Sequence, residues 1–411
     1  MLKCNNMSKN SRTELPEPAA KKPNIGFLPP TYRRSALLFL VVNFFYWAAL
    51  YLYVPIFPVY AQHLGASLSM VGVVVAAYGL PQVFIRIPIG MWSDALSKRK
   101  PLVAASIVIT LLGALGLGLA PSPWFLFLAR FGTGIGAAAW VIFTIYFASY
   151  YPHESTGRAI GLINFVQGTA LVVATSSGGV VAEVWGPRYT FFGAALLGIV
   201  AVIALLLTGE PVRQPSPTTA WQSFTQVAAR PLLLTISGMG ILLQFAVHSS
   251  VFSFIPIYGA KIGASNADLG IITMLALASS AVAALIVMYL AERWGNTTTI
   301  VLGAVLIGLS LLAVPFINKV YLLKLVQISY GFGRGALMTI FMALSIRAVA
   351  PHQQATAMGV YQAIYAVGML TGPLVSGSLA DSLGLASVFY LSASLCLVIA
   401  VVACLPLMPR R

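Results

Sequence analysis

Charged residues are scarce in this sequence: they make up 8% of its 411 residues, and nine of them are acidic. A soluble protein of this length cannot cover its surface with so few charges, so a soluble fold is excluded. The three cysteines, Cys4, Cys396 and Cys404, have no spacing typical of a disulfide framework or a metal site. Nucleic-acid binding is excluded too, because the 24 basic residues are scattered at the ends of apolar runs. The sequence predicts no cofactor.

Hydrophobic residues, in contrast, account for 59% of the sequence. Apolar runs of about 20 residues, the length that crosses a hydrocarbon layer of roughly 30 Å, recur through almost the whole chain. About twelve such runs are present, joined by connections too short for an extramembrane domain. We therefore predict an all-α integral membrane protein with twelve transmembrane helices.

Two polar segments divide this series of runs. Residues 1–34 combine proline with lysine, serine and asparagine, which is typical of a disordered cytoplasmic tail. Residues 209–230 contain proline, serine and threonine and are typical of a linker. We expect an N-terminal six-helix half at 35–208 and a C-terminal six-helix half at 231–408. Basic residues flank the runs on one side, so the positive-inside rule places both termini in the cytoplasm, as in a multi-pass protein of a cell membrane (inner or plasma membrane).

The two predicted halves repeat one another in sequence. Pro58-Val59-Tyr60 returns as Pro256-Ile257-Tyr258, 198 residues later. The same separation relates Gly72 to Gly270, Asp94 to Glu292, Asn164 to Gln362, Gly179 to Gly377, Glu183 to Asp381 and Gly186 to Gly384. A glycine-rich run that begins at Gly132 returns at Gly331, one residue further out. One register across several spans predicts two pseudo-symmetric six-helix bundles in the same orientation.

A short polar segment between the second and third runs, residues 90–100, contains Gly90, Asp94 and a basic cluster. This hinge segment resembles the cytoplasmic signature of the major facilitator superfamily, in which Gly, three residues and Asp precede a group of bases. Gly90 and Asp94 match, whereas Ala95 and Ser97 stand where a base and a glycine are expected. Together with the repeat, the resemblance covers roughly residues 35–408. It implies a secondary transporter in which the two halves rock about a midplane site.

The resemblance assigns the hinge segment to gating. It implies that Asp94 faces the positive N-terminus of the eleventh span, and that Lys98 and Arg99 pair with acidic partners to latch the outward-open state. Arg86, one helical turn before Gly90, is expected to be a gate or interface residue. The alternative is that these charges merely set the topology.

Two arginines inside apolar spans are candidate substrate contacts, because a guanidinium there is costly unless it faces protein or a water-filled cavity. Arg130 precedes a Gly-x-Gly run that resembles the fourth-span signature of the superfamily, which is associated with proton transfer or anion contact. Arg334 lies in the tenth span, where Gln327, Arg334 and Phe341 recur every seven residues on one face. The alternatives are a helix-end arginine that snorkels to the interface for Arg130 and a buried structural pair for Arg334.

No carboxylate lies at the centre of a span, so the usual carrier of proton coupling is missing. His248 lies inside the seventh run and either bonds a backbone carbonyl of its own bundle or lines the cavity; proton coupling is left open. Other candidate contacts are polar or aromatic residues of the spans, each equally explained by an interhelical hydrogen bond. They are Asn43, Tyr46, Trp47, Asn164, Gln167, Gln244, Gln362 and Tyr365.

This candidate site is aromatic and lacks negative charge, which favours a neutral amphipath or an organic anion over a cation. We predict a monomeric carrier, surrounded by membrane lipids, that exports a small amphipathic compound. Two alternative transport functions are uptake or exchange of an organic anion, and lipid translocation. The alternative from a different functional class is a membrane sensor that has lost transport. The Gly-Pro pair that many drug/proton antiporters of the superfamily carry in the fifth span is found here in the eleventh, as Gly372-Pro373. An enzyme is excluded, because the spans contain no His-Glu-x-x-His pair, no Gly-x-Ser-x-Gly elbow and no paired carboxylates.

Overall fold

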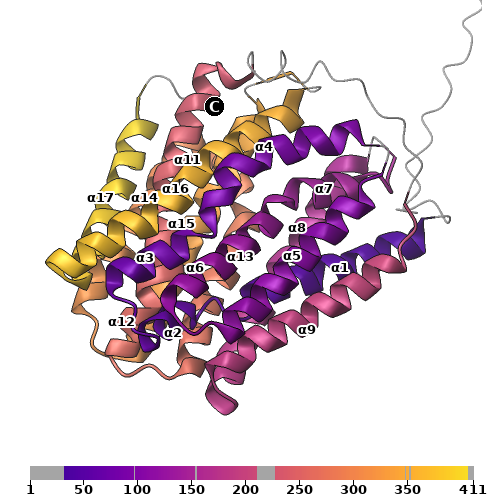
Figure 1. Cartoon of the computed structure of the whole chain (residues 1–411). Coiled ribbons are helices and arrows are strands. Elements are labelled where there is room, and N and C mark those ends of the chain that lie inside the picture. The colour runs from indigo at the N-terminus through magenta and orange to yellow at the C-terminus, as the bar shows by residue number, and fades with distance from the viewer. Residues whose placement is uncertain are drawn as a thin grey trace, which may run out of the picture.

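The computed structural model describes residues 32–96, 98–152, 155–210, 227–347, 349–350 and 353–405, and all regular structure within these ranges is helical (Figure 1). We call residues 32–210 the N-half and residues 227–405 the C-half. The N-half contains α1 (Arg33–Tyr51), α2 (Phe57–His63), α3 (Leu68–Ala76), α4 (Gly79–Ala95), α5 (Lys100–Leu119), α6 (Pro123–Ala138), α7 (Trp140–Ala148), α8 (Thr156–Val184) and α9 (Pro187–Leu206). The C-half contains α11 (Pro231–Ser249), the π-helix η2 (Ser250–Phe254), α12 (Ile255–Lys261), α13 (Asn266–Trp294), α14 (Asn296–Ala313), the 3-10 helix η3 (Val314–Phe316), α15 (Val320–Arg347), α16 (Gln354–Leu383) and α17 (Leu385–Ala403).

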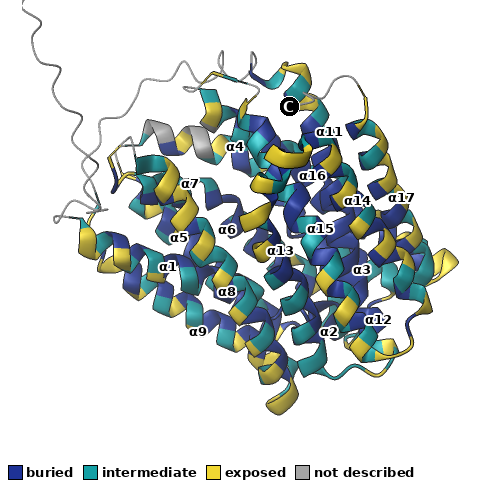
Figure 2. Cartoon of the chain, turned by 180° about the vertical axis from the view of Figure 1, so that it is seen from behind, coloured by how far each residue is buried: buried dark blue, intermediate teal, exposed yellow. Residues whose placement is uncertain are grey.

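Eleven helical stretches of the described chain are long and apolar enough to cross a membrane. α15 has 28 residues, which is also long enough, but it carries Lys324 and Arg334. Large apolar side chains such as Leu112 and Leu285 are exposed on the outside of the bundle, while the interior is buried (Figure 2). Such an apolar exterior suits lipid and not water. The protein is therefore a multi-pass helical membrane protein.

Breaks in two helices repeat in the structure at the separation found in the sequence. α1 ends at Tyr51 and α2 begins at Phe57, so residues 52–56 interrupt the first span. In the seventh span, η2 interrupts the α-helix over Ser250–Phe254, which is 198 residues later. Short π-helical insertions change the direction of side chains and are frequent at functional sites. The two breaks therefore lie at equivalent positions of the first and seventh spans.

The loops after these spans are also equivalent. Gly65 and Gly263 have φ angles of 88° and 90°, which favour glycine. Two residues later, the hydroxyl groups of Ser67 and Ser265 accept hydrogen bonds from the backbone N–H groups of Met70 and Asp268 and cap α3 and α13. The repeat thus includes the helix N-termini. As a result, α3 and α13 begin at equivalent positions in the two halves.

The halves meet mainly along three helix pairs, α8 with α13, α16 with α3, and α16 with α4. We call the face with the hinge segment the hinge face and the face with α2 and α12 the opposite face; they lie at the upper and lower ends of Figure 1. Near the opposite face, a Cβ added to Gly179 would lie 2.8 Å from the Cα of Gly270. Toward the hinge face, a Cβ at Gly157, Gly161 or Gly168 of α8 would have no described atom within 4 Å. The α8–α13 pair is therefore closed at the opposite face and separates toward the hinge face.

Some sequence predictions fall on residues that the structure does not describe. Residues 1–31, most of the predicted tail, and residues 211–226, most of the predicted linker, lie outside the described ranges. The surroundings of Gly90 and the side chain of Asp94 are also outside the description, although both residues belong to α4. The domain boundaries and the gating role of these two residues remain predictions.

Candidate functional site

Aromatic side chains of the N-half form a group that we call the aromatic wall: Trp47 and Tyr51 of α1, Tyr78 between α3 and α4, and Trp140 at the start of α7. The ring centroids of Trp47 and Trp140 are 5.1 Å apart and the rings are nearly perpendicular. Tyr51 lies 6.0 Å from Trp47, one turn along α1. The indole N–H of Trp47 is buried and has no hydrogen-bond partner among the described residues. A buried indole N–H usually has a partner, so this one is available to a ligand.

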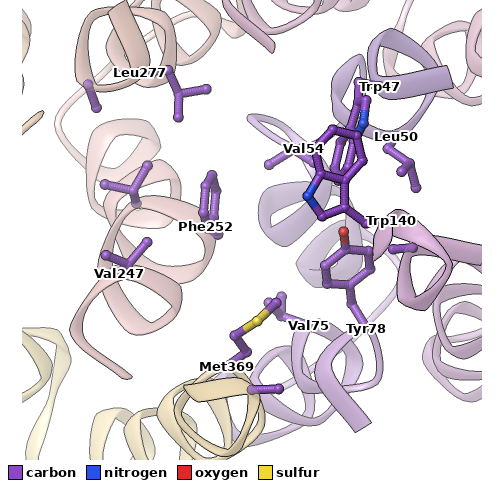
Figure 3. Close-up of a cluster of buried hydrophobic side chains, with 14 of the residues drawn as sticks. Trp47, Leu50, Val54, Val75, Tyr78, Trp140, Val247, Phe252, Leu277 and Met369 are labelled. Atoms are coloured by element: carbon purple, nitrogen blue, oxygen red, sulfur yellow. The ribbon is translucent and has the colours of Figure 1, made fainter. Parts of the chain in front are cut away.

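The C-half approaches the aromatic wall through η2. The ring of Phe252 lies 5.9 Å from the ring of Tyr51, in an edge-on arrangement across the two halves. Figure 3 shows Phe252 and Val247 on one side and Trp47, Trp140 and Tyr78 on the other, with side chains directed toward each other. The two broken spans therefore bring their aromatic rings together between the halves.

Polar side chains of the C-half form a second group, the polar wall: Gln244 and His248 of α11, and Gln327 and Arg334 of α15. Both amide atoms of Gln327, the side-chain oxygen of Gln244 and the Nε of Arg334 are buried without a hydrogen-bond partner in the described chain. A buried polar group without a partner costs about 1–3 kcal/mol. A ligand that supplies the missing partners would recover this cost.

Arg334 is held by one neutral contact of its own half. Its Nη1 donates a hydrogen bond of 3.0 Å to the hydroxyl oxygen of Ser280 in α13. Arg334 is half-buried. The buried structural pair weighed in the sequence is thus a serine and not a carboxylate, so the positive charge is not neutralised by this contact.

Arg130, in contrast, is enclosed by aromatic rings. Its guanidinium carbon lies 5.3, 5.2 and 4.4 Å from the ring centroids of Tyr53, Phe57 and Tyr78, and its Nη1 donates a 2.8 Å hydrogen bond to the Tyr53 hydroxyl. The side chain is 6% exposed, so it does not snorkel to the interface. Cation–π attraction is strong where the cation is removed from water. We therefore assign Arg130 a structural contribution, and its contact with substrate stays a prediction.

Arg86 connects the two halves, and its role as a gate or interface residue stays a prediction. Its Nη1 donates to the backbone carbonyl of Gln362 (3.3 Å) and to the hydroxyl of Tyr365 (3.4 Å) in α16. Its Nη2 donates to the side-chain oxygen of Gln82, one turn away in α4. The predicted substrate residues Gln362 and Tyr365 therefore lie beside Arg86, at the contact between α4 and α16.

His248 satisfies one ring nitrogen within its own helix. Its Nδ1 lies 3.1 Å from the carbonyl oxygen of Gln244, one turn earlier in α11, and therefore donates a hydrogen bond to it. This contact is the backbone hydrogen bond expected for a histidine of its own bundle. The ring also lies 5.1 Å from Phe252, so the same histidine borders the meeting point of the two halves.

Four further candidates belong to the N-half. The Asn43 side-chain N–H donates to the carbonyl of Ile163 (3.1 Å) and joins α1 to α8. The hydroxyl of Ser106 donates to the Tyr46 hydroxyl (3.2 Å) and joins α5 to α1. These are the interhelical bonds that the sequence left as the alternative. Asn164 and Gln167 are half-buried on α8.

The hinge segment is tied to the end of α9. The side chain of Glu210 accepts hydrogen bonds from the backbone N–H groups of Arg99 and Lys100 at the N-terminus of α5. The Lys100 ammonium donates to the carbonyls of Leu206 and Thr208. Lys98 is exposed, and Arg99 donates from its Nε to the hydroxyl of Ser93. The acidic contact described at this segment comes from Glu210 of the same half.

The sequence interpretation did not select Tyr51, Tyr78, Trp140 or Phe252 as site residues. Tyr51, Tyr78 and Trp140 stand at interruptions between helices, and Phe252 lies in η2. The signal in the sequence was the proline-rich segment at 55–58 and its equivalent near Pro256, which indicate broken spans. A search for aromatic residues beside those breaks would have found Tyr51 and Phe252.

The family model described as Major Facilitator Superfamily matches residues 39–263 and 240–411, which together cover most of the chain. The chain belongs to the major facilitator superfamily. It is accordingly a transporter of small molecules and not an enzyme. In this superfamily member, the two walls are positioned by the broken first and seventh spans, by the repeat and by the contact between the halves.

Individual proteins agree with this assignment. The chain is 24% identical over 365 residues to the multi-drug resistance efflux pump PmrA homolog of Lactococcus lactis, covering 85% of this chain and 89% of that protein. The structure is similar to the nucleoside transporter NupG, with a TM-score of 0.77, 15% identity and coverage of 90% and 98%. It is also similar to a bacterial homolog of the human lysosomal transporter Spinster in an inward-facing, unoccupied conformation, with a TM-score of 0.76, 18% identity and coverage of 91% and 95%. The two structures support the fold.

Proposed function

We propose that this major facilitator carrier exports small amphipathic compounds, and that it binds them between the aromatic wall and the polar wall. The observation that carries the proposal is the difference between the side chains that the two halves contribute. The N-half offers four aromatic rings, and the C-half offers buried amide atoms and one guanidinium Nε without partners in the described chain. An amphipathic compound can place its apolar part on one wall and its hydrogen-bonding part on the other.

The charge of the site narrows the substrate. Arg334 belongs to the polar wall, and the hydrogen bond described for it is with a neutral hydroxyl group. A cationic compound would add to this positive charge in a region of low dielectric. The site therefore favours neutral amphipaths and amphipathic anions.

Export is the direction that the relatives support. The similar protein of Lactococcus lactis is named a multi-drug resistance efflux pump, and so are relatives from Streptococcus pneumoniae. By the positive-inside rule, the basic residues at the span ends favour a cytoplasmic position for the hinge face. With that orientation, the separation of α8 and α13 toward the hinge face favours entry of the substrate from inside, where an exporter collects it.

Uptake or exchange of an organic anion is the second candidate, and Arg334 favours it. Its guanidinium has one described hydrogen bond, to Ser280, and an unpartnered Nε. A carboxylate or phosphate could accept two parallel hydrogen bonds from such a group. Substrate charge and direction of transport therefore need separate measurements.

Thermal stabilisation of the purified protein tests the binding proposal. A panel of organic anions, neutral amphipaths, cationic drugs and lipids is added to the protein in detergent, and each hit is repeated on Arg334→Ala. A ligand that binds the folded state stabilises it by about 2.7 kcal/mol at a hundredfold excess over its Kd. We expect neutral amphipaths and anions to stabilise the protein, and the anions to lose their effect in Arg334→Ala. Stabilisation by cations alone would contradict the proposal.

Direction is tested in proteoliposomes that contain the protein in one orientation. A stabilising compound is supplied on the hinge face or on the opposite face, with and without a proton gradient. Export predicts accumulation on the opposite face, driven by the gradient if protons are the coupling ion. Accumulation on the hinge face would favour the uptake alternative.

A further inference from the structure

A carboxylate of the N-half caps a helix of the C-half at the opposite face. Glu183 lies near the end of α8, and its Oε2 accepts hydrogen bonds from the backbone N–H groups of Asn266 (2.8 Å) and Ala267 (3.4 Å). These are the first two residues of α13. The contact therefore runs from one half to the other.

The C-half returns the same contact. Asp381 lies near the end of α16, and its two carboxylate oxygens accept hydrogen bonds from the backbone N–H groups of Leu68 (3.1 Å) and Ser69 (2.8 Å). These are the first two residues of α3 in the N-half. Each of the three residues lies 198 positions from its counterpart, since Glu183 corresponds to Asp381, Leu68 to Asn266 and Ser69 to Ala267. The two contacts are therefore reciprocal and related by the repeat.

The chemistry of a helix N-terminus explains why these carboxylates bind there. The first N–H groups of a helix have no partner within it and carry a partial positive charge. Ser67 and Ser265 occupy the N–H groups of Met70 and Asp268 but leave those of the first two helical residues. In both helices the carboxylate of the other half takes these two groups. Charge-assisted hydrogen bonds of this kind are stronger than neutral ones.

Gly179 and Gly377 each lie one helical turn before the carboxylate residue of their helix, and their close contacts show that α8 touches α13 and that α16 touches α3 at this level. A Cβ on Gly179 would lie 2.7 Å from the carbonyl oxygen of Asn266, and a Cβ on Gly377 would lie 2.8 Å from the carbonyl oxygen of Leu68. Since glycine has no Cβ, the backbones come close enough for the carboxylates to reach the opposing helix termini. Opening the opposite face must break both contacts.

We propose that Glu183 and Asp381 are positioning residues of the transport cycle: a reciprocal pair of latches that holds the opposite face closed and is released when that face opens. Asp268, in the first turn of α13, differs in this respect. Asp268 stands at the same N-terminus as the Glu183 contact, but it bonds Ser265 and, at 2.5 Å, Lys324 of its own half. It is the matched control, since its loss removes a carboxylate from this face without removing a contact between halves.

The distance between the halves at the opposite face is the measurement. Spin labels are placed at His63→Cys and Lys261→Cys, which are exposed, 198 residues apart and line one cavity of about 460 Å³ on this face. The three native cysteines are replaced by alanine, and double electron–electron resonance is recorded in nanodiscs without substrate. Gly179→Leu serves as the reference for the open distance, because its side chain would collide with the backbone of α13.

Glu183→Ala and Asp381→Ala should each raise the ratio of open to closed molecules about tenfold, and the double variant about a hundredfold. Exchange of the two native acids, as Glu183→Asp with Asp381→Glu, should keep the face closed, and Asp268→Ala should leave the distance distribution unchanged. The proposal is overturned if the double variant keeps the closed distance while Gly179→Leu opens, or if Asp268→Ala opens the face as far as Glu183→Ala.

Discussion

The two halves of this transporter share their framework but differ in what they present to one another. Helix breaks, capped helix termini, positive-φ glycines and the acid contacts at the opposite face repeat at one separation. The inner surfaces do not repeat: the N-half presents the aromatic wall, and the C-half presents the polar wall. The comparison suggests that symmetric parts serve the movement of the halves, whereas asymmetric parts serve recognition of the substrate.

The buried arginines show the same division. In the fourth and tenth spans the repeat is offset by one residue, so Arg130 corresponds to Ser329 and Arg334 to Ile135. Neither arginine has a counterpart in the other half. Arg130 is enclosed by three aromatic rings and bonds the Tyr53 hydroxyl, whereas Arg334 bonds the Ser280 hydroxyl; the Nε of each has no hydrogen-bond partner in the described chain. We therefore expect substitutions of the two to affect different properties.

The largest effect expected is on the stability of the N-half. Arg130→Ala removes the cation from its aromatic cage and leaves the Tyr53 hydroxyl without its described donor. We expect a loss of about 3 kcal/mol of unfolding free energy, measured as a lower apparent Tm in detergent. Substrate affinity of the molecules that remain folded should be unchanged. A stable Arg130→Ala with lost binding would remove the distinction between the two arginines.

Arg334→Lys tests recognition by the C-half. Lysine keeps the charge but loses the planar fork that bonds an anion through two nitrogens. We expect transport of an anionic substrate to fall about tenfold, a change of about 1.4 kcal/mol, while the apparent Tm stays within about one degree of the parent. A neutral substrate is the control and should be transported at the parental rate. Equal losses for both substrates would point to a structural role.

Trp47→Ala tests recognition by the N-half. The substitution removes one ring of the Trp47–Trp140 pair and the unpartnered indole N–H. An aromatic contact of this kind contributes about 1 kcal/mol, so the Kd for an aromatic substrate should rise about fivefold in equilibrium dialysis. Trp92→Ala, at an exposed position of α4, is the control. A matching rise for a substrate without a ring would argue against stacking on this wall.

The smallest effect is expected at Gln327, whose two amide atoms are buried without partners. Gln327→Leu replaces them with an apolar group of similar size, so the unfolding free energy should stay constant or increase. Affinity for a hydrogen-bonding substrate should fall about threefold, a change of about 0.6 kcal/mol. Isothermal titration measures both the Kd and the loss of binding enthalpy. An unchanged Kd would exclude Gln327 from the polar wall.

The fold was predictable because its determinants are local in sequence. The length of the apolar runs gives the spans, and the separation of Pro58 from Pro256 gives the repeat. The family model and the solved structures confirm the superfamily and the two-bundle architecture. The predicted domain boundaries and the roles of the site residues stay predictions.

The arrangement of the candidate site was less predictable, because it depends on partners from distant helices. Nothing near Arg130 in sequence indicates that Tyr53, Phe57 and Tyr78 surround it. Likewise, Glu183 and Asp381 are visibly equivalent in sequence, but the helix termini that they cap belong to the other half. Such contacts follow from how the two bundles pack and not from the pattern of either one.

The contact between Trp47 and Trp140 gives this protein a natural optical reporter. Four of the other tryptophans, Trp92, Trp124, Trp185 and Trp294, are exposed on the outside of the bundle, whereas this pair is buried between the halves. Brominated lipids would therefore quench the emission of the exposed set and spare the pair. Once Trp221, which lies outside the described residues, is replaced by phenylalanine, the remaining intrinsic fluorescence would report on whether a compound has entered between the halves.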